Sequence, residues 1–199
     1  RILNELKSTN NKVWARKCII KEVTSFEKNE FLNNNHIQGN DRSKIKLGLY
    51  YDGNLLSLMT FNKPRHSIGK TKLQQEDSWE LLRFCNKINT NVVGGASRLL
   101  SYFINNYQPK LIYSFSDNRW SSPTINIYNT LNFKNITTSK YGYFYTKDFN
   151  SKLHRFNYTK KSLIQRGWGS IDETENTIMN RMGYKAIYDA GTTRWEMYL

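Results

Sequence analysis

The sequence has few of the residues that build disulfide frameworks, metal sites and membrane spans. Cysteine occurs only at Cys18 and Cys85, outside any CxxC motif, and histidine occurs three times. These counts exclude a disulfide framework and favour the absence of a structural zinc site. No run of about eighteen apolar residues is present, and the first residues lack a signal-peptide pattern. We therefore expect an intracellular protein with no membrane partner and no metal.

Acidic residues are scarce as well, with 16 Asp and Glu against 30 Lys and Arg, which gives a formal net charge of +14. Such an excess attracts polyanions and releases their counterions on binding. The expected partner is therefore nucleic acid, although a basic surface also serves solubility alone. The aromatic content of 14% argues against a disordered basic tail. Aromatic rings also supply surfaces on which bases can stack.

Composition changes along the chain predict three parts. Residues 1–12 combine a short helical pattern with a polar break, and the first methionine is Met59, so we expect a linker from an upstream domain. Residues 13–147 carry alternating strand and helix patterns and form the predicted main domain. Residues 148–199 are basic and aromatic, with helical pieces and a small hairpin of residues 184–189 and 194–199, and form a predicted basic C-terminal subdomain.

Turn chemistry and apolar periodicity predict the elements of the main domain. Asp52-Gly53-Asn54 separates two apolar runs and predicts a β-hairpin of residues 45–51 and 55–61. Ser25 is a candidate N-cap for a helix through Phe31, and Pro123 suits the first turn of a second helix. Asn132 is expected to close that second helix in the left-handed conformation. Residues 141–146 are the predicted last strand of the sheet.

A glycine-rich turn lies where a predicted strand gives way to an amphipathic helix. The helix is indicated by Leu99, Leu100, Phe103 and Ile104. Free amides and the positive dipole end at such a helix start can bind phosphate. A tight turn that only packs the helix on the sheet explains the glycines equally well. The candidate anion-binding residues of this turn are Val93, Gly94, Gly95, Ala96 and Ser97.

The order of these elements from about residue 13 to 146 resembles the GNAT acyltransferase fold. In that family a Gln/Arg-x-x-Gly-x-Gly/Ala turn holds the pyrophosphate of acyl-CoA, and Asn91, Gly94 and Ala96 occupy its places here. The resemblance implies an α+β (α/β) fold with a mixed, mostly antiparallel central sheet flanked by helices. It makes acyl-CoA (acetyl-CoA) the candidate cofactor and Tyr128 the candidate general acid. His36 or Asp117 is a conceivable base.

Nearly the whole chain is also similar to a region of phage proteins related to homing endonucleases, in which a very-short-patch-repair-type nuclease domain comes first. The resemblance implies an upstream nuclease domain and a phage-encoded protein in the host cytoplasm. The segments that carry it are Arg16-Lys17-Cys18, residues 35–39, 47–50, 58–61, 79–85, 92–97 and 184–191.

Two functions follow from these observations. A protein-interaction module is a third possibility, but it does not explain the net positive charge. The first is a DNA-binding and targeting domain that needs no cofactor and contacts duplex DNA. The second is an acyl-CoA-dependent transferase that modifies a nucleobase amine, as in Mom-like proteins, or another amine. For Arg119 and Trp120 a packed cation–π pair is an equal alternative, and Tyr128 also fits a core position. The candidate nucleic-acid-binding residues are Arg65, Lys70, Lys72, Arg83, Arg119, Trp120, Lys152, Arg155, Lys160 and Lys161.

Overall fold

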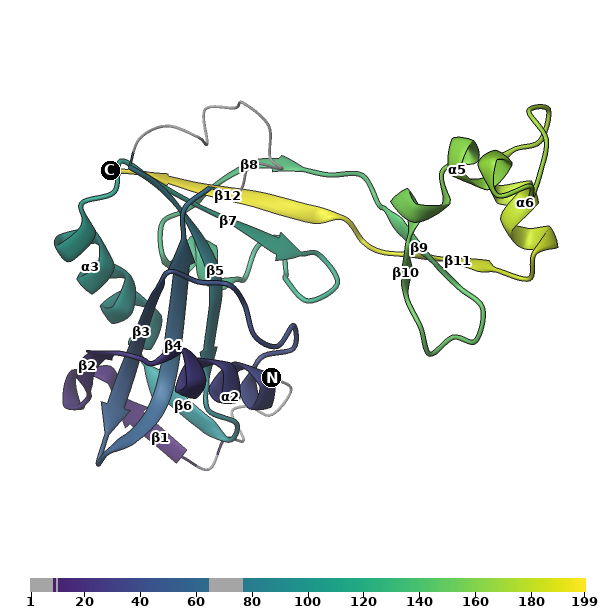
Figure 1. Ribbon diagram of the computed structural model, residues 1–199. Coiled ribbons are helices and arrows are strands. Elements are labelled where there is room, and N and C mark those ends of the chain that lie inside the picture. The colour runs from purple at the N-terminus through teal and green to yellow at the C-terminus, as the bar shows by residue number, and fades with distance from the viewer. Residues whose placement is uncertain (1–8, 10, 65–76) are drawn as a thin grey trace. The chain divides into compact units, whose positions relative to one another are not determined.

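The computed structural model describes residue 9, residues 11–64 and residues 77–199 (Figure 1). The chain forms two units. The first comprises the described residues up to Ser116 together with Ser122–Thr137 and Arg194–Leu199, and the second comprises Asp117–Ser121 and Thr138–Thr193. The last residues thus return to the first unit, so the two parts are not separated by a single boundary at residue 147.

The first unit contains a seven-stranded sheet in the order β2-β3-β4-β5-β7-β12-β8 and a two-stranded parallel pair, β1-β6. Its elements, some of which extend a residue or two into the second unit, are β1 (Asn11–Trp14), the 3-10 helix η1 (Ala15–Lys17), β2 (Ile19–Glu22), α2 (Ser25–Asn35), β3 (Ile45–Tyr51), β4 (Asn54–Asn62), β5 (Ser78–Asn86), β6 (Thr90–Val93), α3 (Gly95–Tyr107), β7 (Leu111–Asp117), α4 (Ile127–Thr130), β8 (Lys134–Thr138) and β12 (Thr192–Tyr198).

Most neighbouring strands of this sheet are antiparallel, which confirms the predicted fold class. The pairs β2–β3, β3–β4 and β4–β5 are antiparallel, and β5 pairs with β7 in parallel. The predicted hairpin is confirmed as β3 and β4, with Asp52 at φ 48° and Gly53 at φ 76° in its turn. Glycine adopts a positive φ without steric cost, and aspartate tolerates it better than most residues.

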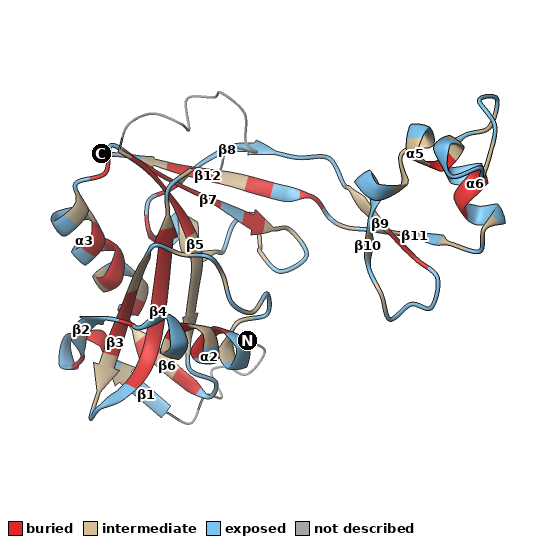
Figure 2. Cartoon of the chain, in the orientation of Figure 1, coloured by how far each residue is buried: buried red, intermediate tan, exposed pale blue. Residues whose placement is uncertain are grey.

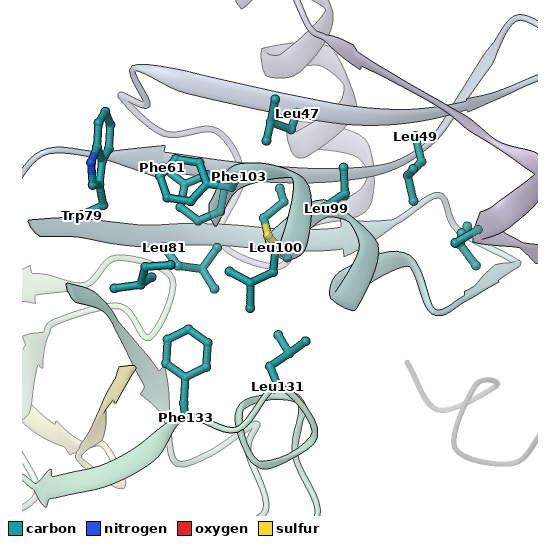
Figure 3. Packing of buried hydrophobic residues seen from close by; sticks show 14 of the residues in the cluster. Leu47, Leu49, Phe61, Trp79, Leu81, Leu99, Leu100, Phe103, Leu131 and Phe133 are labelled. Carbon is teal, nitrogen blue, oxygen red and sulfur yellow. The ribbon is translucent and has the colours of Figure 1, made fainter. Parts of the chain in front are cut away.

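Helix α3 covers one face of the sheet and supplies its main core. Phe103 stacks on Phe61 of β4 with ring centroids 3.6 Å apart, and Trp79 of β5 meets Phe103 edge-on at 5.4 Å. Figure 3 shows Leu131 and Phe133 approaching the same cluster from the segment after α4. The amphipathic helix predicted from Leu99, Leu100, Phe103 and Ile104 is therefore confirmed, and the first three of these residues are buried.

Helix α2 packs against the opposite face of the sheet and forms a second, smaller core there. Phe31 and Leu32 of α2 pack with Leu55 and Leu58 of β4 and with Val23. The N-cap is Thr24, whose hydroxyl accepts from the amide of Glu27 at 3.2 Å, so the prediction of Ser25 as the cap is wrong by one residue. The two helices and the sheet form three layers.

The second unit has a three-stranded sheet in the order β10-β9-β11. One face of this sheet packs against helices around the buried residues Tyr145, Leu163, Ile178 and Met179. Figure 2 shows buried positions in the helices of this unit. The elements are β9 (Tyr143–Thr146), β10 (Leu153–His154), the 3-10 helix η4 (Arg155–Tyr158), α5 (Lys160–Gln165), α6 (Glu175–Arg181) and β11 (Lys185–Tyr188).

Two predicted strand pairings are wrong. Residues 141–146 do not end the main sheet, because β9 pairs with β10 and β11. Residues 184–189 and 194–199 do not form a hairpin, because β12 lies between β7 and β8. An alternating pattern shows that a segment is a strand but does not identify its partner. The second unit is therefore an insertion between two neighbouring strands of the main sheet.

The segment before β8 also differs in part from the prediction. Helix α4 begins at Ile127, and its N-cap is Asn126, whose side chain accepts from the amide of Asn129 at 2.9 Å. Pro123 therefore precedes the helix instead of occupying its first turn. Asn132 has φ 62°, which confirms the predicted left-handed residue after this helix.

Candidate functional site

Helix α3 begins with amide groups that no capping side chain accepts. Its N-cap is Gly94, at φ 75°, and the first bond to it within the helix is made by the amide of Arg98. By contrast, Thr24, Asn126, Thr159 and Thr174 each accept an amide at the start of their helices. The start of α3 therefore offers donors and a positive dipole end to an anion.

An open pocket of about 580 Å³ lies at this helix start. Gly94, Ser97 and Ser101 line it from the α3 side, and Trp14 and Arg16 line it from β1 and η1. The guanidinium of Arg16 also lies 5.4 Å from the ring centre of Trp14. The pocket thus combines free helix amides, a cation and an aromatic ring, which suits a ligand with phosphates and an aromatic base.

Sequence reasoning missed one wall of this pocket. Trp14 and Arg16 lie almost eighty positions before Gly94, and they reach it because β1 pairs in parallel with β6. The side chain of Arg98 then fastens α3 to the carbonyl oxygen of Ala15. The sequence shows that residues 12–17 are basic and contain an aromatic residue. This composition does not indicate where in the fold these side chains lie.

The predicted anion-binding residues divide into two groups. Val93, Gly94 and Ser97 line the pocket. Gly95 is buried, and a Cβ atom there would lie 3.2 Å from Val92 Cγ1, while Ala96 packs against the main core. Gly95 and Ala96 therefore contribute to close packing, and any contact they make with a ligand goes through their amides.

Strands β5 and β7 pair only at their beginnings. The register joins Ser78–Glu80 to Leu111–Tyr113 and then stops, although both strands continue. Beyond this point Ser114 Oγ donates to the carbonyl oxygen of Leu81 at 2.8 Å. The backbone pairing of the two strands therefore ends beside Ser114, and we call this place the opening.

Tyr128 of α4 contacts this opening through its hydroxyl group. Its Oη atom lies 3.1 Å from Ser114 Oγ. Because Ser114 donates its hydrogen to Leu81, the hydroxyl of Tyr128 is the donor of this bond. The ring stacks on Trp195 at 5.2 Å, and the indole of Trp195 donates to Ser116 Oγ. Burial raises the pKa of Tyr128, so it is protonated at neutral pH.

Arg83 lies close enough to His36, Tyr128 and the thiol of Cys85 to act on them electrostatically. Its charge lowers the pKa of His36, Cys85 and Tyr128. Burial is the largest influence at Cys85 and raises its pKa to about 12, so the thiol is not a nucleophile at neutral pH. Arg83 is half-buried and donates to the carbonyl oxygen of Leu82. It is therefore part of this opening and not of an exposed basic surface.

His36 is held near the opening in a form that is not basic. Burial lowers its pKa to about 4, and Arg83 adds to this effect while Asp41 opposes it. Its Nδ1 atom accepts from the amide of Gln38 at 3.1 Å, so the ring hydrogen is on Nε2. The one basic nitrogen is therefore occupied, which argues against His36 as the general base.

Asp117 belongs to the second unit, and its carboxylate is taken up by Arg119. Arg119 Nε lies 3.0 Å from both oxygens of Asp117, and the amide of Arg119 donates to the same carboxylate. These hydrogen bonds lower the pKa of Asp117. This agrees with a turn-capping role and argues against Asp117 as a base.

The remaining basic candidates are distributed over both units. Arg65, Lys70 and Lys72 lie outside the described residues. Trp120 and Arg119 are exposed, and so are Lys152, Arg155 and Lys161. Lys160 is half-buried and donates to the carbonyl oxygen of Ile171. The structure therefore leaves Lys152, Arg155 and Lys161 exposed to solvent, whereas Arg119 is paired with Asp117 and Lys160 makes a structural contact.

Two further findings concern only the part of the chain that the structure describes. Within residues 11–64 and 77–199, no three His, Cys, Asp or Glu side chains gather in a metal-binding arrangement. No helix among the same residues is long and apolar enough to span a bilayer.

Comparison with known proteins relates this chain to others through its fold. No family model and no curated protein match the sequence. The ribosomal-protein-S18-alanine N-acetyltransferase of Escherichia coli matches with a TM-score of 0.53 and 9% identity, over 91% of this chain and 93% of that chain. An acetyltransferase of Bacillus subtilis in complex with CoA and the IAA acetyltransferase of Bacillus cereus each match with a TM-score of 0.51 and 12% identity, over 92% of this chain and 99% of theirs. The fold is therefore GNAT-like, the fold of N-acetyltransferases.

Proposed function

We propose that the protein is an acyl-CoA-dependent N-acyltransferase. The observation that carries this proposal is the open pocket at the uncapped start of α3, in a sheet whose strands β5 and β7 cease to pair beside Tyr128. The similarity to N-acetyltransferases, one of them in complex with CoA, supports it. The acceptor is an amine, and a nucleobase amine is the candidate that the Mom-like resemblance favours.

The residues at the α3 pocket suit the nucleotide end of acyl-CoA. The amides of Gly95, Ala96 and Ser97 can donate to the diphosphate, and Arg16 supplies a positive charge at the same pocket. The exposed ring of Trp14 offers a stacking surface for the adenine, with 44% of the residue accessible. These groups come from two segments that the β1–β6 pair and the Arg98 contact hold together.

Tyr128 is the proposed general acid. Bound acyl-CoA would supply a thioester whose acyl group moves to an acceptor amine, so that the C–S bond breaks as the C–N bond forms. The leaving sulfur needs a proton, and the buried hydroxyl of Tyr128 holds one at neutral pH. Ser114 and the stacked Trp195 fix the position of that hydroxyl. The amine proton leaves to water, because neither His36 nor Asp117 presents a basic atom.

Titration of acetyl-CoA into the chain by calorimetry, in enough salt to screen nonspecific attraction, tests the first step. We expect saturable binding that Ser97→Asp weakens more than tenfold. An acidic side chain in the first turn stabilises a helix, so the loss cannot come from unfolding α3. Asn105→Asp, at the exposed far end of α3, is the matched control and should bind normally. Absence of binding, or equal weakening by both variants, contradicts the proposal.

The catalytic step has a separate test. Tyr128→Phe keeps the ring that stacks on Trp195 and removes the proton donor. We expect kcat for acyl transfer to an amine to fall by about 10²-fold or more, with little change in the KM for acetyl-CoA. An unchanged kcat would remove Tyr128 from the mechanism.

DNA binding is the second candidate function. Its support is the net charge of +14 and the exposed cations Lys152, Arg155 and Lys161 of the second unit. In this proposal the chain positions duplex DNA for an upstream nuclease of the homing-endonuclease type in the host cytoplasm. We expect affinity for a duplex to fall steeply with salt, and Lys161→Glu to weaken it more than Lys87→Glu, which changes the net charge equally in the first unit. Affinity that is independent of salt contradicts this candidate.

A further inference from the structure

A second open pocket, of about 730 Å³, lies entirely within the second unit, and we call it the tyrosine pocket. Its lining residues are Ser139, Lys140, Tyr141, Tyr188, Asp189 and Ala190. They come from the two segments that flank the three-stranded sheet. Acyl transfer at the α3 pocket makes no use of any of these residues.

The walls of the tyrosine pocket are two tyrosines that the fold leaves accessible. Tyr141 is 70% exposed and Tyr188 is 59% exposed, and their rings meet edge-on at 5.7 Å. Tyr188 also contacts Tyr143, with ring centres 5.5 Å apart. The hydroxyl of Tyr143 is in turn bonded to Glu175 at 2.8 Å. Tyr188 is therefore held in place while one of its surfaces stays open to a ligand.

The backbone around the tyrosine pocket is fixed by hydrogen bonds. Asp189 Oδ1 accepts from the amides of Gly142 at 2.7 Å and Gly191 at 2.8 Å, so its charge is compensated. Asn118 donates from its backbone amide to Gly191 and from its side chain to Ala190, both at 3.1 Å. The pocket is thus formed before any ligand binds, which lowers the entropic cost of binding.

Asn118 also brings a cation and a third aromatic ring to the same neighbourhood. It lies in the short segment that carries Arg119 and Trp120, and the Trp120 side chain is exposed. The charge of Arg119 interacts with Asp189 of the pocket as well as with its partner Asp117. Lys140 lines the pocket itself. Open aromatic surfaces are therefore combined with cations, which is the combination that binds single-stranded nucleic acid.

We propose that the tyrosine pocket binds an unpaired nucleobase of single-stranded nucleic acid, with the base stacked on the exposed ring of Tyr188 and a flanking phosphate at Lys140. The ring of Tyr141, which meets Tyr188 edge-on, borders the base at its edge. This inference rests on the nucleic-acid-binding function proposed above and names the chemistry of one contact. A base stacked on an aromatic ring needs no particular sequence, because every base has a π-face.

Fluorescence anisotropy of the full 199-residue chain tests this inference with a labelled oligothymidine. The second probe is an abasic strand of the same length and charge, and the third is a duplex. The variants are Tyr188→Ala, Tyr141→Ala and Tyr188→Phe, which retains the ring. Phe26→Ala removes a side chain that is 80% exposed in the first unit and is the matched control. Circular dichroism confirms that each variant is folded.

We expect the oligothymidine to bind more tightly than the abasic strand, and Tyr188→Ala to weaken oligothymidine binding about tenfold. Tyr188→Phe and Phe26→Ala should bind as the unchanged chain does, and no variant should alter abasic binding. Equal affinity for the oligothymidine and the abasic strand, or no effect of Tyr188→Ala, overturns the proposal that this pocket binds a base. If the chain still binds the duplex in a salt-dependent way, the broader nucleic-acid-binding function stands. Absence of binding to all three probes overturns both.

Discussion

The two units bury their cores with different kinds of side chain. The first unit uses a large cluster of mainly leucines, phenylalanines and two tryptophans, Trp79 and Trp195. The second has a cluster of four buried hydrophobic residues, and half-buried tyrosines and Trp168 pack against them. Apolar burial therefore dominates the stability of the first unit. The smaller second unit also depends on polar contacts made by the hydroxyl groups and faces of its aromatic side chains.

In the second unit these polar contacts are made by Glu175 and Arg166. Glu175 accepts from the hydroxyls of both Tyr143 and Tyr145, at 2.8 and 3.0 Å. Arg166 lies over the rings of Tyr158 and Trp168, at 5.2 and 5.6 Å from their centres. We therefore expect apolar truncation to destabilise either unit, and loss of the charge at Glu175 to destabilise the second unit alone.

The largest effect is expected from Phe103→Ala. It removes the ring that stacks on Phe61 and should lower the free energy of unfolding of the first unit by about 4 kcal/mol. Hydrogen exchange should show lost protection in β3 and β4 while β9 and β11 keep theirs. Phe26→Ala, at an exposed position of the same unit, is the control. Equal loss in both units would show that they unfold together.

The corresponding change in the second unit is Ile178→Ala. Ile178 is fully buried, and its truncation should destabilise that unit by about 3 kcal/mol. The control is Ile171→Ala, the same substitution at a residue that is 76% exposed. If hydrogen exchange is faster in β9 and β11 but unchanged in β4, the two cores are independent. Faster exchange in β4 as well would show that the two cores do not unfold independently.

Acidification from pH 7 to 4.5 should lower the free energy of unfolding of the first unit by about 2 kcal/mol relative to the second, through His36. The pKa of His36 is lowered from 6.5 to about 4 in the folded state, so folding favours the neutral ring. The contribution of His36 to the stability of the first unit is therefore fully present above pH 6.5 and is lost as the pH falls toward 4. His36→Asn keeps an acceptor for the amide of Gln38 and should flatten this dependence. Denaturant unfolding at pH 4.5 and at pH 7 measures the difference in unfolding free energy. If the variant shows the same difference as the unchanged chain, His36 is not its cause.

The smallest effect, about 1 kcal/mol, is expected from Glu175→Gln. The amide oxygen still accepts from Tyr143 and Tyr145, but the bonds lose their charge assistance. Burial and Glu175 raise the pKa of both tyrosines, so their contribution to stability is present below pH 10 and is lost at higher pH. The variant should shift the tyrosine titration, followed by absorbance, to lower pH. Asp172→Asn, at an exposed position, should not.

Local parts of the fold could be predicted from the sequence because short-range chemistry determines them. Asp52 and Gly53 define the β3–β4 hairpin through their backbone preferences, and Leu99, Leu100 and Phe103 define α3 through their spacing. The place of β12 could not be predicted, because it pairs with β7 and β8 across the whole inserted unit. Alternation indicates a strand but carries no information on a partner that distant in sequence.

The candidate site divides in the same way. Gly94 and Ser97 were predicted because a strand, a glycine turn and a helix follow one another locally. Trp14 and Arg16 were missed, because only the β1–β6 pair brings them to the same pocket. The lowered pKa of His36 could not be predicted either, since it depends on the burial of the ring and on the position of Arg83.

The position of β12 has a consequence for biosynthesis. This strand fills the place between β7 and β8, yet the ribosome makes it only after the entire inserted unit. Until then the facing edges of β7 and β8 have no strand between them, and unpaired edges invite pairing with other chains. The nascent first unit therefore stays incomplete and prone to aggregation while the second unit is translated and folds, and its sheet closes last.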